Sequence, residues 1–188
     1  MSKSAYKKKE LETLISLAQI GDSKAMEEIV KRVQKEVYAL FYHLVDKKEN
    51  VSDLTQEALF KMAKSIHQLK KTENFKTWLN QIITNIYYDF IKKYPNKFVE
   101  LSEEQFNEIK DKLGCEPGER CLFAEVEKII QAAIFTLPKN LRITLVLREY
   151  EGLSYEEIAK VTNSAIGTVK SRLSRARFKL QKELKEFI

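Results

Sequence analysis

The residues best suited to chemistry in this chain lie near its C-terminal end, in the run AIGTVKSRLSRARFKL at residues 165–180. Seven basic and two acidic residues follow Ser164, which gives this end of the chain a local charge of +5. Apolar residues recur in the run at spacings of three and four: Ile166, Val169, Leu173, Ala176 and Leu180. This spacing predicts a helix that buries one apolar stripe and turns its basic side outward, where it can bind a polyanion.

The outward side of this helix carries hydroxyl and basic side chains, which are groups that proteins use to read DNA. Arg and Lys donate hydrogen bonds to guanine, whereas Ser and Thr suit either bases or phosphates. We expect the following residues to contact DNA: Thr168, Lys170, Ser171, Arg172, Ser174 and Arg175.

The segment before this helix has the features of a first helix and a tight turn. Ser154 and Glu157 have the spacing of a capping box, which predicts a short helix over residues 155–161. Asn163 tolerates the left-handed backbone conformation that the following turn requires. A helix, a tight turn and a basic helix form the layout of a DNA-binding helix-turn-helix. The alternative is a basic amphipathic helix that closes a bundle or binds a partner protein.

The whole chain predicts an all-α fold of two helical domains joined by a flexible linker. Its 188 residues include only 5 Gly and 3 Pro, so few residues would break a helix. We place the first domain at residues 1–95, an acidic linker at 96–121 and the second domain at 122–188. Between Asn96 and Arg120 there are four basic and seven acidic residues, a local charge of −3.

Helical periodicity and breaking residues divide the two domains further. Residues 10–45 are predicted to be helical with a break at 21–23, where Asp22 or Ser23 caps the second helix. Further helices are predicted over the ranges 51–66, 75–93, 103–113, 122–135 and 138–150. Pro138 fits the first turn of the last of these helices.

Enzyme and membrane functions are not predicted. The sequence has no Gly-rich phosphate loop and no metal-spaced pair of His, so we expect no catalysis, no cofactor and no metal site. Cys115 and Cys121, spaced C-x5-C, leave a redox switch or a zinc site as an alternative. No apolar run approaches the ~20 residues of a membrane helix, and we expect no signal peptide because no apolar segment follows the basic start. We therefore expect a cytoplasmic protein that does not insert into a membrane.

Three runs of the sequence resemble bacterial sigma factors. Residues 137–177, LPKNLRITLVLREYEGLSYEEIAKVTNSAIGTVKSRLSRAR, resemble the family's promoter −35-binding region. The runs VSDLTQEALFKMAKSI and FKTWLNQIITNIYYDFIKK, at residues 51–66 and 75–93, resemble its conserved second region. The short length of the chain, with only these two regions and a linker, is similar to that of the extracytoplasmic-function group. The resemblance implies an initiation factor that binds RNA polymerase core, reads the −35 and −10 elements and assists −10 melting.

The resemblance also implies roles for particular residues. Residues matching the helix that binds the clamp helices of the polymerase large subunit are Asp53, Leu54, Gln56, Glu57 and Phe60. Residues matching the element that melts and reads the −10 DNA are Lys71, Asn74, Phe75, Trp78, Asn80, Thr84, Asn85 and Lys92. The segment LKKTEN, residues 69–74, would form the base-capturing loop. From Lys64 to Lys97 there are seven Lys against two acidic residues, a local charge of +5.

Several positions depart from the common pattern of this family. Asn80 stands where many relatives carry an aromatic residue, and Gln81 and Thr84 stand where they often carry Arg. Ala165 replaces a common Ser or Pro, so we expect Ser164 to cap the last helix. We expect Trp78 to be at least partly buried, because a single Trp at helical spacing usually packs in a core.

Two further expectations follow from the family. An anti-sigma factor is expected to cover the polymerase-binding and DNA-binding faces, and the acidic linker is expected to pass through the polymerase channel. A flexible tether kept in solution by its charge explains the linker composition equally well. The competing function is a stand-alone transcription regulator, which would bind duplex promoter DNA through the helix-turn-helix without polymerase.

Overall fold

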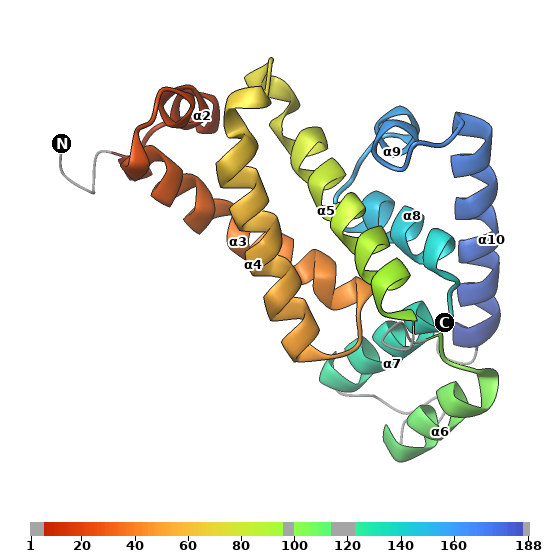
Figure 1. Ribbon diagram of the computed structural model, residues 1–188. Helices are drawn as coiled ribbons and strands as arrows, with labels where there is room; N and C mark the ends of the chain where they lie inside the picture. Colours follow the sequence, from red (N-terminus) through yellow and green to blue (C-terminus); the bar gives the residue numbers. More distant parts are fainter. Residues whose placement is uncertain (1–5, 96–99, 114–122, 186–188) are drawn as a thin grey trace. The chain divides into compact units, whose positions relative to one another are not determined.

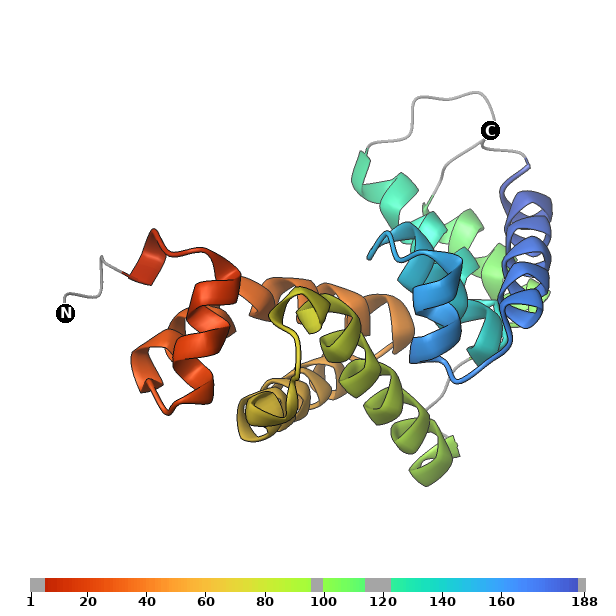
Figure 2. The same ribbon diagram turned by 90° about the horizontal axis from the view of Figure 1, so that it is seen from above.

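A computed structural model gives the structure of the chain for residues 6–95, 100–113 and 123–185. Every regular element in these ranges is a helix (Figure 1, Figure 2). The chain forms two compact units, one of Met1–Tyr42 with Lys47–Lys93 and one of His43–Asp46 with Tyr94–Ile188. The predicted all-α fold with two helical domains is confirmed.

The first unit includes helices α2 to α5 and two 3-10 turns, after a short helical stretch at Tyr6 and Lys7. Their bounds are α2 Leu11–Gln19, α3 Ser23–Leu44, α4 Lys48–Ser65, η1 Ile66–Gln68, η2 Thr72–Asn74 and α5 Phe75–Lys93. The break at Gly21 and the bounds of α5 are as predicted. Helix α4 begins three residues earlier than predicted because its N-cap is Lys47, which makes no side-chain cap and leaves no capping signal.

The core of the first unit follows from the 3.6-residue spacing of its apolar residues. In α3 the buried side chains include Ile29, Val33, Val37 and Leu40, which recur at three or four residues on one face. Helices α4 and α5 pack along each other, and α2 contacts η1 and η2. The segment between α4 and α5 is thereby attached to α2 as well as to its own two helices.

The start of α3 is fixed by a capping residue and by the segment that precedes α2. Oδ1 of Asp22 accepts hydrogen bonds from the backbone N–H of Lys24 at 2.9 Å and of Ala25 at 3.1 Å. Oδ2 of Asp22 accepts the phenolic O–H of Tyr6 at 2.8 Å. Asp22 is therefore the cap of α3, one of the two candidates predicted from the sequence.

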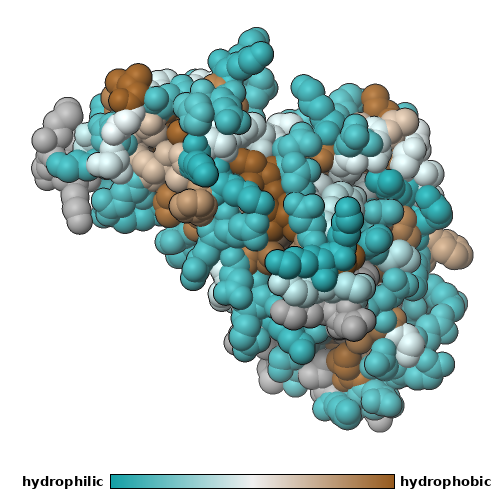
Figure 3. Space-filling model, viewed as in Figure 1, coloured by the Kyte–Doolittle hydropathy of each residue, from teal (hydrophilic) through white to brown (hydrophobic). Residues whose placement is uncertain are grey.

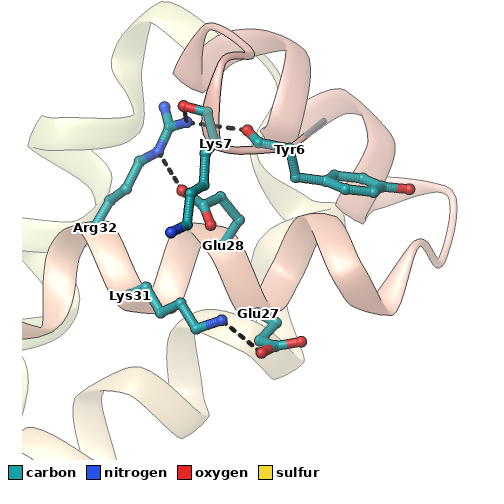
Figure 4. Close-up of polar contacts among 6 residues, drawn as sticks. All are labelled: Tyr6, Lys7, Glu27, Glu28, Lys31 and Arg32. Atoms are coloured by element: carbon teal, nitrogen blue, oxygen red, sulfur yellow. Dashed lines mark hydrogen bonds and ion pairs between the residues drawn. The ribbon is translucent and has the colours of Figure 1, made fainter. Parts of the chain in front are cut away.

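Arg32 holds the same N-terminal segment from the side of α3 (Figure 4). Its Nη2 donates to the carbonyl oxygens of Tyr6 at 3.2 Å and Lys7 at 3.0 Å, and its Nε donates to Glu28 at 3.1 Å. Residues far apart in the sequence thus fix how the N-terminal segment lies on α3.

The second unit contains five helices in its described part. Their bounds are α6 Glu103–Leu113, α7 Phe123–Phe135, α8 Lys139–Glu149, α9 Tyr155–Val161 and α10 Ile166–Leu184. The predicted bounds of α6 and α9 are confirmed. Pro138 is the N-cap of α8 and lies just outside its first turn, which corrects the predicted position by one residue.

Helix α6 lies within the predicted linker, yet it is packed into the second unit. Phe106 is fully buried and joins a core with Ile129, Ala132 and Ala133 of α7. Ser102 and Gln105 cap the helix reciprocally, since Gln105 N–H donates to Ser102 Oγ at 3.2 Å and Ser102 N–H donates to Gln105 Oε1 at 3.0 Å. Part of the acidic segment therefore belongs to a folded core.

Most of the surface visible in Figure 3 is hydrophilic. Among the described residues, a few large apolar side chains remain strongly exposed, including Ile20 at 83%, Phe60 at 68% and Phe178 at 73%. Within the same residues, no helix combines the length and apolar character needed to cross a bilayer.

The cap of α3 predicts a stability that depends on pH. Hydrogen bonds from the N–H of Ala25 and from Tyr6 lower the pKa of Asp22 below its ordinary value. A lowered pKa means that the carboxylate stabilises the fold above about pH 4 and loses this effect as the pH falls through the folded-state pKa. Asp22→Asn keeps a capping oxygen but cannot ionise.

We therefore expect wild type to be more stable than Asp22→Asn at pH 7, with the difference shrinking as the pH falls below about 4. Urea unfolding midpoints of both proteins between pH 7 and pH 3 measure this difference. A difference that stays constant over this range would contradict the role of the ionised carboxylate.

Candidate nucleic-acid interface

Helix α9, the turn after it and helix α10 have the geometry of a helix-turn-helix. The capping box at the start of α9 is present, because Glu157 N–H donates to Ser154 Oγ at 3.1 Å and Ser154 N–H donates to Glu157 Oε2 at 2.8 Å. Asn163 has φ of 47°, the left-handed conformation predicted for the turn. In the described residues it is the only non-glycine residue with positive φ.

The apolar stripe of α10 packs against α8 and α9. Val169, Leu173 and Ala176 are each at most 1% exposed, and Leu180 packs against the core that includes Phe106. Ile166 is 41% exposed, so its predicted burial is wrong. It occupies the first position of the helix, ahead of the turn where packing begins at Val169.

The residues expected to contact DNA are turned away from this stripe. Lys170, Ser171, Ser174 and Arg175 are exposed, and Thr168 and Arg172 are half-buried. Arg175 Nε donates to the carbonyl oxygen of Ser171 at 3.3 Å, so the side chain of Arg175 lies along the helix surface. These side chains form one continuous polar and basic surface, which we call the α10 basic face.

Ser164 does not cap α10, contrary to the prediction. The N-cap is Ala165, which has no side chain able to accept a hydrogen bond. Ser164 Oγ instead donates to the carbonyl oxygen of Thr162 at 3.1 Å and accepts from Arg172 Nη1 at 2.9 Å. Because the Ser164 hydroxyl makes these two contacts, it orients the side chain of Arg172 and does not cap the helix.

The basic residues of α10 divide into two groups that the sequence did not distinguish. Arg177 pairs with Glu149 at 2.8 Å, Lys182 pairs with Glu103 at 2.8 Å, and Lys179 donates to the carbonyl oxygen of Thr136 at 2.6 Å. The hydrogen bond from Glu149 raises the pKa of Arg177, and that from Glu103 raises the pKa of Lys182.

Lys170, Arg172 and Arg175 form the second group, since none has a carboxylate partner among the residues that the structure describes. Of the α10 cations without a carboxylate partner in the described residues, Lys170, Arg172 and Arg175 lie on the basic face, whereas Lys179 is directed to the carbonyl oxygen of Thr136. The partners of the first group lie 28, 43 and 79 residues away in the sequence, too far for helical periodicity to reveal them.

In the first unit, the segment between α4 and α5 exposes Lys71 and Asn74, and α5 exposes Asn85 and Lys92. Trp78 is half-buried, which confirms the expectation of partial burial, and its ring lies 6.0 Å from that of Phe75. The exposed residues of this set are basic or carry amides, the groups that hold a single strand of DNA.

Three residues expected at binding surfaces are buried instead. Asn80 is 2% exposed, Thr84 is fully buried, and Phe75 is 4% exposed, so the structure does not present them to a ligand. The reason is that α5 buries a broad face, which includes Ile83 and Tyr87 as well. Asn80 Nδ2 also donates to the carbonyl oxygen of Lys76 at 3.1 Å within the helix.

Helix α4 places the residues expected to bind polymerase on one exposed face, with one exception. Asp53, Gln56, Glu57 and Phe60 are exposed and have the spacing of a single helix face. Leu54 is 5% exposed and belongs to the core of the first unit, so its expected role in binding stays a prediction. Phe60 is therefore a large apolar group on a polar surface.

No metal site is seen in the described ranges: no three His, Cys, Asp or Glu side chains come together as ligands would. Cys115 and Cys121, the alternative for a redox or zinc site, lie outside these ranges.

Two family models match this chain. Residues 29–95 match Sigma-70 region 2, and residues 127–180 match Sigma-70, region 4. The chain is 31% identical over 179 residues to the ECF RNA polymerase sigma-E factor of Haemophilus influenzae, covering 92% of this chain and 94% of the relative. It is 32% identical over 184 residues to the RNA polymerase sigma-H factor of Pseudomonas aeruginosa, covering 93% and 94%.

Solved structures show the same similarity. The sigma factor RpoE of Bartonella quintana, in complex with the anti-sigma factor NepR, has a TM-score of 0.65 and 27% identity, covering 86% of this chain and 98% of that chain. CnrH in complex with the cytosolic domain of CnrY has a TM-score of 0.67 at 20% identity, covering 93% and 96%, and supports the fold alone.

The turn before α10 predicts a difference between two substitutions at one position. Asn163→Ala should destabilise the second unit by about 1 kcal/mol, because a left-handed conformation strains a residue with a plain Cβ. Asn163→Gly should have little effect, since Gly adopts positive φ without strain. Urea unfolding of the three proteins measures the effect. Equal stability of the Ala and Gly variants would contradict the strain argument.

Proposed function

Because this chain belongs to the extracytoplasmic-function group of the sigma-70 family, we propose that its two units divide promoter recognition between them, α10 at the −35 element and the α4–α5 segment at the −10 element. The chain is a transcription initiation factor that directs RNA polymerase to specific promoters. In residue terms, we propose a region 2 domain at 1–95, an acidic linker at 96–121, of which α6 packs onto the second unit, and a region 4 domain at 122–188.

The observation that carries the −35 role is the α10 basic face. Lys170, Arg172 and Arg175 have no carboxylate partners in the part of the chain that the structure describes, whereas Arg177 and Lys182, further along α10, are paired within the protein. Long basic side chains on the first half of a helix suit the major groove, where Arg and Lys donate to guanine. Thr168, Ser171 and Ser174 lie beside them and suit bases or phosphates.

The −10 role is supported by the exposed residues of the first unit. Lys71 and Asn74 on the loop, and Asn85 and Lys92 on α5, can hold the backbone and an unstacked base of a melted strand. Trp78 offers a half-exposed aromatic ring beside them. The buried residues Phe75, Asn80 and Thr84 support these groups from inside and are not proposed to contact DNA.

The exposed face of α4 is the proposed binding surface for the clamp helices of the polymerase large subunit. Phe60 provides an apolar anchor, and Asp53, Gln56 and Glu57 surround it with polar groups, as at the core and rim of a protein interface. No catalytic role is proposed for any residue, because the factor acts by binding.

An anti-sigma factor is the second proposed partner. The solved RpoE relative named above was captured with the anti-sigma factor NepR, which supports this proposal. A partner of this kind would cover the polymerase-binding and DNA-binding faces. We place the protein in the cytoplasm, where promoter DNA and polymerase core are found.

Run-off transcription with bacterial core polymerase on genomic promoter fragments tests the proposed function. Discrete transcripts that appear only when the protein is added are expected. Unchanged transcription, together with tight binding of the protein alone to duplex DNA, would instead identify a stand-alone regulator.

Two arginines of α10 provide a matched test of the −35 role. Arg175→Ala should lower the affinity of the holoenzyme for promoter DNA and reduce the slope of log affinity against log salt by about 1, if it contacts a phosphate. Arg177→Ala removes the same charge from a paired position and should change the slope far less. Equal effects of the two substitutions would show that only net charge matters.

Two exposed apolar residues provide a matched test of polymerase binding. Phe60→Ala should weaken binding to core polymerase about tenfold or more, as expected for an aromatic anchor at the centre of an interface. Ile20→Ala removes a residue that is 83% exposed and should leave this affinity unchanged. Titration of labelled protein with core polymerase measures both. Unchanged affinity of Phe60→Ala would remove α4 from the proposed interface.

A further inference from the structure

Gln19, the last residue of α2, makes two long-range hydrogen bonds that the proposed function does not use. Its side-chain Nε2 donates to the carbonyl oxygen of Ile66 at 3.0 Å and to that of Leu69 at 2.7 Å. These acceptors lie 47 and 50 residues further along the chain. A primary amide has two N–H groups on Nε2, so both of them are satisfied by this pair of carbonyls.

The two carbonyls mark the point where the chain leaves α4 and enters the loop. Carbonyl groups at the end of a helix lack partners inside the helix. Ile66 O also accepts the N–H of Leu69 at 3.1 Å, which closes the η1 turn. Gln19 therefore binds both ends of this turn at once and fixes the direction in which the chain continues at Leu69.

Helix α2 is a firm support for this contact. Leu14 and Ile15 are fully buried and Ala18 is 9% exposed, so one side of α2 is part of the core. Gly21, with φ of 93°, ends the helix directly after Gln19 and Ile20, and its N–H donates to Ala18 O at 3.0 Å. The backbone position of Gln19 is thus fixed from both sides.

The loop contacts α2 and α5 through η2, yet most of its side chains face solvent. Lys70, Lys71, Glu73 and Asn74 are exposed. Asn74 N–H donates to Lys71 O at 3.1 Å, and the ammonium of Lys71 lies 3.9 Å from the carboxylate of Glu73, a weak exposed pair.

The two ends of the loop anchor it in addition to these contacts. Leu69 is 6% exposed and Phe75 is 4% exposed, so both ends are anchored in the core of the first unit. Phe75 is held by α5, of which it is the first residue, and Leu69 is held by the amide of Gln19.

We propose that Gln19 is a positioning residue that holds the loop of residues 70–74 ready to capture an unstacked base of the −10 strand. The proposal rests on the −10 role of this loop stated above. A loop whose entry point is fixed in advance loses less conformational entropy when DNA binds, so capture is stronger. Gln19 acts through the loop and does not itself contact DNA.

The test uses holoenzyme and a duplex promoter fragment that the wild-type protein transcribes, with permanganate reactivity of the −10 thymines as the measure of opening. Gln19→Met keeps the length of the side chain but has no N–H donor, and Gln19→Glu places a carboxylate against the two carbonyls. Two ordinary hydrogen bonds predict a loss of promoter opening of about fivefold to twentyfold for Gln19→Met, and at least as much for Gln19→Glu. Gln34→Met, at an exposed position of α3, should open the promoter as wild type does.

A double-mutant cycle separates positioning from general destabilisation. In an Asn74→Ala background, where base capture is already impaired, Gln19→Met should cause a much smaller further loss. Affinity for core polymerase should stay unchanged in every variant, since α4's exposed face is not altered. An equal loss in both backgrounds, or opening by Gln19→Met at the rate of Gln34→Met, would overturn the positioning role alone. Absence of any transcript with wild-type protein would overturn the proposed function first.

Discussion

The burial of Val169, Leu173 and Ala176 against α8 and α9 is the interaction on which the α10 basic face depends. A helix with one stripe buried has its rotation fixed, so the side chains on its other faces have fixed directions as well. Further along α10, Arg177 and Lys182 form ion pairs that neutralise their charges. What remains is a compact basic face rather than an evenly charged helix.

The same physical arrangement recurs in the first unit. Exposed polar groups on α4 and in the α4–α5 segment belong to elements whose other side is buried. Exposed Asp53 precedes buried Leu54, and exposed Asn74 precedes buried Phe75. Recognition groups are therefore held by apolar packing that does not take part in recognition. Asn80 and Thr84, which match the family's motifs, are buried in the same interior.

The sequence predicts the features that depend on residues close together in the chain, such as helix bounds and caps. The bounds of α5, α6 and α9, the capping box at Ser154 and the left-handed Asn163 all follow from side chains within a few residues. The sequence does not predict the start of α4, because Lys47 gives no capping signal. The predicted cap by Ser164 is wrong because its hydroxyl accepts a hydrogen bond from Arg172, eight residues further along the chain. Contacts such as Gln19 with Leu69 could not be predicted, since periodicity indicates which face is buried but not what lies against it.

The central claim is that α10 lies at the −35 element while the loop after α4 lies at the −10 element of the same promoter. Directed DNA cleavage tests it most directly, with iron–EDTA attached to a single cysteine at position 171 or 74 in a protein whose Cys115 and Cys121 are replaced by Ser. In the holoenzyme–promoter complex, we predict cleavage centred on the −35 element from Ser171→Cys and on the −10 element from Asn74→Cys. Cleavage of the same site from both positions, or of neither element, would contradict the account.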